Sequence, residues 1–173
     1  IMNQSLIDKT SIFQTRPKYT NEGKKEILHN FFENKKIGDS LKPVVVTAYD
    51  LEARKPILLS SYSDPEISAV QAANASSAAP IYFPTASMED GRWLIDGGIA
   101  TNNPALLGYI EAKKLFGTDN LKILGIGAGL NKRKISGKNS RNWGALGWMR
   151  HDILGIMLES SLQNEILKDL IGD

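Results

Sequence analysis

A carboxylate followed by two glycines is the feature of this sequence with the clearest chemical potential. Asp96, Gly97 and Gly98 come directly after the short apolar run at residues 93–95. Ligands of open α/β sheets bind outside the carboxyl ends of the strands, and glycine lets the backbone adopt a positive φ or approach a partner closely. Asp96 is therefore a candidate general base, although Asp-Gly-Gly taken alone is more often a simple turn.

Other common catalytic groups are scarce. The chain has no cysteine, which excludes disulfides, zinc fingers, iron–sulfur clusters and thiol catalysis. Its two histidines are His29 and His151, and the latter is followed by Asp152. Neighbouring helical residues point about 100° apart, so His151 and Asp152 do not form a natural relay pair. A Ser-His-Asp triad and a histidine-ligated metal site are both weakly supported.

Residues 125–129 read Gly-Ile-Gly-Ala-Gly and follow an apolar run. This pattern resembles a nucleotide-binding loop, but the third glycine at the required offset and the helical pattern after it are missing. No Gly-Lys-Ser or Gly-Lys-Thr is present. An ordinary exit from a strand into a loop is the favoured interpretation, and a nucleotide-binding domain is a weaker hypothesis.

The elements that would position Asp96 alternate between strands and helices. Apolar and β-branched runs predict strands at residues 43–49, 57–60, 92–95 and 121–126, of which the first would be buried on both faces and pair with the second as a hairpin. Helical periodicity and Asp-Pro or Asn-Pro starts predict helices at residues 24–33, from Asp64 to about Ala75, from Asn103 to Gly117, and at residues 143–170. The alternation is typical of an α/β domain.

Composition agrees with a single domain. The 173 residues are 42% hydrophobic and 23% charged, with a formal net charge of +2. These values exclude a disordered tail, a coiled coil and a membrane-spanning protein, and they give no reason to expect nucleic acid as a partner. The basic stretch at residues 131–141 reads as a solvated loop, with an anionic ligand as its alternative. Trp143, Trp148 and Met149 could form an apolar lip, although core packing is the favoured use.

Two motifs that stand close together extend this interpretation. Residues 75–84 read Ala-Ser-Ser-Ala-Ala-Pro-Ile-Tyr-Phe-Pro, and residues 93–104 read Trp-Leu-Ile-Asp-Gly-Gly-Ile-Ala-Thr-Asn-Asn-Pro. The combination closely resembles the C-terminal half of the catalytic domain of patatin-like phospholipases. Tyr19, Glu22-Gly23, Phe31-Phe32 and residues 47–50 resemble the middle region of that family, so the likeness covers about residues 12–130.

The resemblance implies an α/β three-layer sandwich with a mainly parallel sheet, which would be incomplete in this chain. It also implies a lipid acyl hydrolase, of the phospholipase A type or a general acyl esterase, that uses a Ser–Asp dyad without histidine. The aspartate of that dyad corresponds to Asp96, and Gly97 and Gly98 would shape its loop. Such a dyad requires no cofactor and no metal. The expected partner is a lipid or acyl-ester substrate, with peripheral membrane contact an option and no nucleic acid.

The sequence departs from the family in one respect. No serine stands in a Gly-x-Ser-x-Gly nucleophile elbow, and the glycine-rich oxyanion segment is also missing. Ser76 and Ser77 lie on no such elbow and are expected at a helix end or pocket wall. We therefore expect residues 1–173 to be the C-terminal portion of a patatin-like domain whose N-terminal half completes it. The alternative is a catalytically inactive lipid-binding or interaction module on the same scaffold.

Overall fold

The computed structural model describes residues 16–127, 129, 134–151, 153–157, 166 and 169–170. The chain divides into two compact units, Ile1–Ala100 and Thr101–Asp173. Each unit is described separately below. The candidate base Asp96 and the 75–84 motif both lie in the first unit, so the site can be built from that unit alone.

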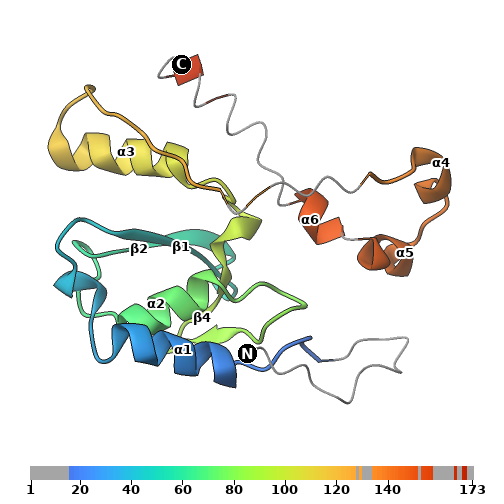
Figure 1. Ribbon diagram of the computed structural model, residues 1–173, viewed down its shortest axis with the longest axis horizontal. Coiled ribbons are helices and arrows are strands. Elements are labelled where there is room, and N and C mark those ends of the chain that lie inside the picture. The colour runs from blue at the N-terminus through green and yellow to red at the C-terminus, as the bar shows by residue number, and fades with distance from the viewer. Residues whose placement is uncertain are drawn as a thin grey trace. The chain divides into compact units, whose positions relative to one another are not determined.

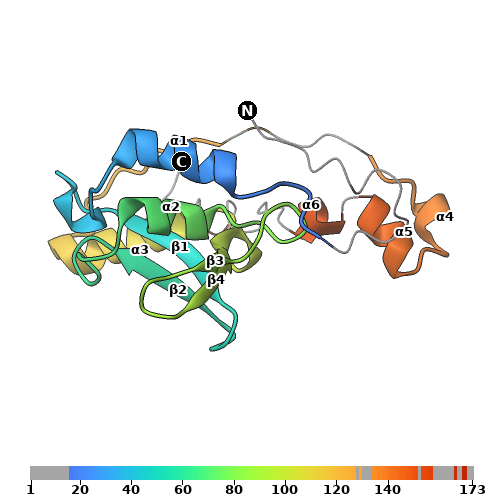
Figure 2. The ribbon, with the colours of Figure 1, turned by 90° about the horizontal axis from the view of Figure 1, so that it is seen from below.

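The first unit is built on a four-stranded sheet with the order β2-β1-β4-β3. Figure 1 labels β1, β2 and β4, and Figure 2 also labels β3. The strands are β1 (Val45–Asp50), β2 (Lys55–Ser60), β3 (Ala86–Ser87) and β4 (Trp93–Asp96). The three strands predicted in this unit are confirmed to within two residues at each end, as is the hairpin between the first two.

The α/β fold class is confirmed, but the described strands do not form the mainly parallel sheet that we expected. All three of their pairings are antiparallel. Residues 51–54 join β1 to β2, and residues 88–92 join β3 to β4. Parallel strands need a crossover of a dozen or more residues, so these short connections allow only antiparallel neighbours.

Two helices cover one face of this sheet. Figure 2 shows α2 (Ala69–Ser76) lying between the sheet and α1 (Glu22–Phe32). The helix predicted at residues 24–33 is confirmed as α1, but α2 begins five residues after the predicted start at Asp64. The reason is local, because Asp64 Oδ2 accepts a hydrogen bond from Ser60 N at 3.1 Å and closes the turn after β2. The aspartate is therefore not available to cap a helix.

The core lies between the sheet and α2. Cross-strand partners share a face of the sheet, and Ala48, Leu59 and Leu94 all lie on the face toward α2. These side chains are completely buried, whereas Thr47 and Tyr49 on the opposite face are only partly buried. The prediction that this strand is buried on both faces is therefore wrong for the described residues. Asp96 pairs with Ala48, which places its side chain on the face toward α2.

The second unit contains α3 (Ala105–Phe116), as the Asn-Pro signal predicted. Asn103 Oδ1 accepts a hydrogen bond from Ala105 N at 2.9 Å, and the helix ends at Gly117 with a left-handed φ of 62°. The strand predicted at residues 121–126 is not formed. A strand requires a neighbour for its backbone groups, and these residues have no ladder partner among the described residues.

The described part of the C-terminal region includes the short helices α4 (Gly137–Ser140), α5 (Ala145–Arg150) and α6 (Ile153–Met157). The continuous helix predicted at residues 143–170 is therefore interrupted, since His151 ends α5 outside helical geometry. Most of the predicted helix beyond residue 157 lies outside the described residues. Among the helices that the structure describes, none has both the length and the apolar composition needed to cross a membrane.

Candidate active site

Asp96 is the last residue of β4. Three interactions with the backbone of other residues fix its position. It pairs with Ala48 across the sheet, and its N–H donates to Ala78 O at 3.2 Å. Its Oδ1 accepts a hydrogen bond from Gly98 N at 2.8 Å, which caps the 3₁₀ turn η2 (Gly97–Ile99). The side chain is partly buried. Among the described residues, none donates a hydrogen bond to Oδ2.

The two glycines after Asp96 have different roles. Gly97 lies against β1, where a Cβ atom would come within 2.6 Å of Thr47 O and 2.5 Å of Thr47 C. Gly98 supplies the N–H that holds Asp96 Oδ1. Neither glycine adopts a positive φ. Glycine was expected here for close approach to a partner or for a positive φ. The close approach is found at Gly97, and neither residue has a positive φ.

The 75–84 motif contacts Asp96 through its backbone. Ser76 ends α2, and Ser77 is its C-cap residue, with Oγ donating to Ala73 O at 2.7 Å. These positions suit the helix-end role expected for both serines. The next residue, Ala78, is buried and provides the carbonyl that holds Asp96 N. The motif thus links the end of α2 directly to the candidate base.

Beyond Ala78 the chain turns at residues 80–82. Ile81 has a φ of 72°, which is unusual for a β-branched residue. The N–H groups of Lys18 and Tyr19 donate to Ile81 O and Tyr82 O, both at 2.8 Å. Tertiary hydrogen bonds of this kind can hold a backbone conformation that the local sequence does not favour.

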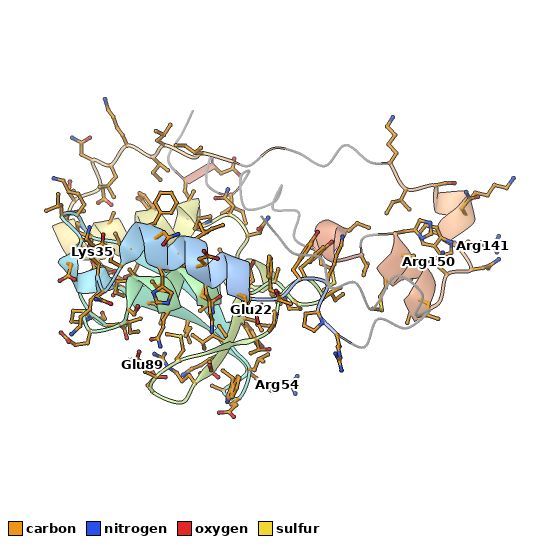
Figure 3. All side chains as sticks on the ribbon, turned by 60° about the horizontal axis from the view of Figure 1, so that its bottom comes forward. Glu22, Lys35, Arg54, Glu89, Arg141 and Arg150 are labelled. Carbon is orange, nitrogen blue, oxygen red and sulfur yellow. The ribbon has the colours of Figure 1, made fainter. Side chains whose placement is uncertain are left out.

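Sequence reasoning missed Lys24, which lies in the first turns of α1 and reaches under this helix toward α2. Its Nζ lies 3.2 Å from Ser77 O, 3.3 Å from Ser77 Oγ and 3.4 Å from Asn74 O, and 4.3 Å from the centre of the Phe83 ring. Figure 3 shows α1 passing across α2 between the labelled residues Glu22 and Lys35. No sequence signal separates Lys24 from its exposed neighbour Lys25, because both occur in a polar helix start.

Burial lowers the pKa of the Lys24 ammonium to about 8. The Asp96 carboxylate acts in the opposite direction and raises this pKa, while the charge of Lys25 lowers it further. The Lys24 ammonium therefore lies close enough to the Asp96 carboxylate for the two charges to attract each other. The candidate site therefore contains a carboxylate and a partly buried cation that come from different elements.

The remaining sequence candidates have surroundings of their own. His29 is exposed on α1, and His151 Nδ1 lies 2.8 Å from Gly147 O, with its ring stacked on Trp143. Asp152 and residues 131–133 of the basic stretch lie outside the described residues. Trp143 also packs edge-to-face against Trp148, but both rings are only partly buried and Met149 is 50% exposed, so the core packing preferred for these side chains is not found among the described residues. Within the described parts of the chain, no three acidic or histidine side chains gather as a metal site would require.

The structure does not form the strand that the nucleotide-loop hypothesis requires before residues 125–129. Residues 121–127 form no strand, whereas such a loop must follow a strand and open a helix. Residues 121–126 line an open cavity of about 350 Å³ beside α3. Within that lining, Lys122 is the cationic side chain.

The sheet, its covering helices and the carboxylate at a strand end define the class as an α/β domain with a candidate hydrolytic site. Comparison with protein families matches residues 2–109 to the family described as "Patatin-like phospholipase". The chain therefore belongs to the patatin-like phospholipase family.

Individual relatives agree with this membership. Patatin-like protein 1 of Arabidopsis thaliana is 28% identical over 189 residues, covering 91% of this chain and 46% of the relative. Patatin-like protein 2 of the same plant is 31% identical, covering 80% and 41%. A cGAMP-activated phospholipase of Pseudomonas aeruginosa is 28% identical, covering 93% and 51%. The chain spans about half the length of these curated relatives.

Proposed function

We propose that the protein containing this chain is a lipid acyl hydrolase in which Asp96 is the general base of a Ser–Asp dyad. The observation that supports it is the geometry of Asp96 at the end of β4. Its Oδ1 is held by Gly98 N, and no described residue donates to its Oδ2. A carboxylate held in this way can accept a proton from a serine within hydrogen-bond reach.

The reaction follows from this arrangement. Asp96 takes the proton from the serine Oγ as that oxygen bonds to the ester carbonyl carbon. The bond from this carbon to the alcohol oxygen then breaks, and the leaving alcohol takes the proton from Asp96. Water repeats the sequence on the acyl-serine, with Asp96 again as the base, and releases the fatty acid. The serine belongs to a nucleophile elbow that residues 1–173 do not contain.

The substitution Asp96→Asn in the whole protein tests this assignment. We expect kcat for p-nitrophenyl butyrate and for a fluorogenic phosphatidylcholine to fall by about 10²- to 10⁴-fold, the usual contribution of a general base. The fold should remain intact, because an asparagine Oδ1 still accepts the Gly98 N–H. Circular dichroism and thermal melting check the fold.

Asp90→Asn is the matched control. Asp90 lies in the turn before β4, where it forms an exposed ion pair with Arg92, so the same chemical change there should leave turnover near the wild-type rate. Wild-type turnover in a folded Asp96→Asn protein would remove Asp96 from the mechanism.

A second candidate function is a catalytically inactive lipid-binding or interaction module. It is favoured by the absence of a Gly-x-Ser-x-Gly motif from the 173 residues. The complete coding sequence separates the two proposals. A nucleophile elbow and a glycine-rich oxyanion segment before residue 1 support the hydrolase, and a complete protein without them supports the binding module.

A further inference from the structure

Lys24 makes contacts that a helix-surface lysine does not usually make. Its Nζ lies within 3.4 Å of two backbone carbonyls at the end of α2, Asn74 O and Ser77 O, and 4.3 Å above the Phe83 ring. The negative end of a helix dipole attracts a cation, and so does the face of an aromatic ring. Three features therefore hold one ammonium in the same place.

This arrangement carries a cost that a purely structural role does not explain. Lysine is rarely buried, because its ammonium loses hydration, and here burial lowers the Lys24 pKa to about 8. Lys25 is the next residue of α1 and stays exposed. A methionine at position 24 could cover α2 equally well without losing hydration. The charge itself therefore requires a reason.

The position of the contacts supplies that reason. Asn74 and Ser77 belong to the last turn and C-cap of α2, and the next residue, Ala78, accepts the hydrogen bond from Asp96 N. One short path of bonds therefore runs from the Lys24 ammonium to the backbone of the candidate base. The carboxylate of Asp96 is also near enough to act electrostatically on Lys24.

We propose that Lys24 is a positioning residue for Asp96, whose protonated side chain fixes the end of α2 and thereby the carbonyl that holds the base. The inference rests on the proposed function of Asp96. It predicts an activity that depends on the protonation of Lys24. The charged groups that act on this ammonium are Asp96 from β4 and Lys25 from α1, and α2 itself carries no charged residue.

The experiment compares Lys24→Met, Lys24→Arg and the matched control Lys25→Met in the whole protein. The measurements are kcat and KM for p-nitrophenyl butyrate from pH 6 to pH 10. Wild-type kcat should fall as pH rises through about 8, where Lys24 loses its proton. Lys24→Met should lower kcat at pH 7 by about 10- to 100-fold, the scale of a small displacement of a catalytic group, and leave KM nearly unchanged.

The two remaining variants identify the cause. Lys24→Arg keeps a charge that does not titrate below pH 10, so it should keep most of the activity and lose the decline near pH 8. Lys25→Met should keep the wild-type kcat at pH 7, because Lys25 is exposed, and should shift the decline slightly to higher pH, because the charge of Lys25 lowers the Lys24 pKa. A wild-type kcat and pH profile in Lys24→Met would overturn the inference, as would the same loss in Lys25→Met. If Lys24→Met does not fold, a decline near pH 8 that persists in Lys24→Arg overturns it.

A stability measurement checks the protonation independently of turnover. Between about pH 8 and pH 10.5 the unfolded chain keeps the Lys24 proton and the folded chain does not. The unfolded state then binds more protons, so the free energy of unfolding should rise with pH across this window. The difference between wild type and Lys24→Met isolates this contribution, and a difference that does not change with pH would contradict it.

The failure of this inference can be told apart from a failure of the proposed function. An inactive Asp96→Asn protein combined with a fully active Lys24→Met protein removes only the role of Lys24. A fully active Asp96→Asn protein removes Asp96 as the base, whatever the Lys24 variants show.

Discussion

At the scale of single residues, Gly97 is the described glycine at which an added Cβ would meet the shortest contact. Its α-carbon packs on β1 so closely that a methyl group would meet the backbone of Thr47 at 2.5–2.6 Å. The obstacle is backbone rather than a flexible side chain, so the turn after β4 would have to move away. Asp96 is the preceding residue, and any such movement displaces its carboxylate.

Gly97→Ala should therefore lower both stability and turnover. Inserting a methyl group into a tightly packed position typically costs about 1–3 kcal/mol. Urea unfolding measures the stability, and hydrolysis of p-nitrophenyl butyrate measures the turnover.

Gly108→Ala is the control for this change. Gly108 lies inside α3, where a Cβ would meet nothing within 4 Å, so alanine should stabilise the helix by about 0.5–1 kcal/mol. Equal effects at positions 97 and 108 would contradict the packing argument.

The residues of the site differ in how far the sequence predicts them. Asp96 was predicted because a carboxylate and two glycines form a contiguous motif at the end of an apolar run. Lys24 could not be predicted, because its role depends on contacts with Asn74 and Ser77, about 50 residues away. Local patterns report local structure, whereas the position of a cation near a carboxylate depends on how the elements pack.

At the scale of elements, the β1–β2 hairpin depends on one buried acid. Asp50 is 7% exposed, and its Oδ1 accepts hydrogen bonds from Glu52 N at 3.0 Å and Ala53 N at 2.9 Å. The side chain thus satisfies two backbone donors of the connecting turn. This hairpin supplies β1, on which both β4 and Gly97 rest.

Asp50→Ala should destabilise the protein by about 1–3 kcal/mol, because it leaves these two donors without their acceptor. Asp50→Asn keeps an oxygen in the same place and should lose clearly less. Thermal or urea unfolding of both variants measures the difference. If alanine and asparagine have equal effects, the hydrogen bonds are not the cause.

Elements were predicted best where one local signal acts alone. The hairpin, α1 and α3 have clear periodicity or capping residues, and their bounds are confirmed within about two residues. The start of α2 was predicted wrongly, because the cap residue Asp64 is used by the preceding turn. Residues 121–126 were predicted as a strand from their apolar composition alone, and composition does not supply a pairing partner.

At the scale of the whole molecule, the described residues leave large apolar side chains in solvent. Phe31 is 76% exposed, Leu124 83% and Ile126 88%. Exposed apolar groups of this size often mark surfaces that another segment or chain covers. Because the chain spans about half the length of its relatives, the other part of a protein of their length could provide that cover.

We therefore expect residues 1–173, when expressed alone, to self-associate and to bind a hydrophobic dye such as ANS. Size-exclusion chromatography with light scattering should give a mass above the 19.0 kDa of one chain. Adding the N-terminal half of the domain should reduce both association and dye binding. A soluble monomer that melts cooperatively and binds no dye would contradict this expectation.

The pairing of Asp96 with Ala48 also limits how the gene can change in length. Side chains alternate between the two sheet faces, so a slip of β4 by one residue would bring Ile95 to the place of Asp96 and turn the carboxylate to the other face. Insertions in the turn at residues 88–92 leave this alternation intact. A single codon added or removed between Trp93 and Asp96 does not.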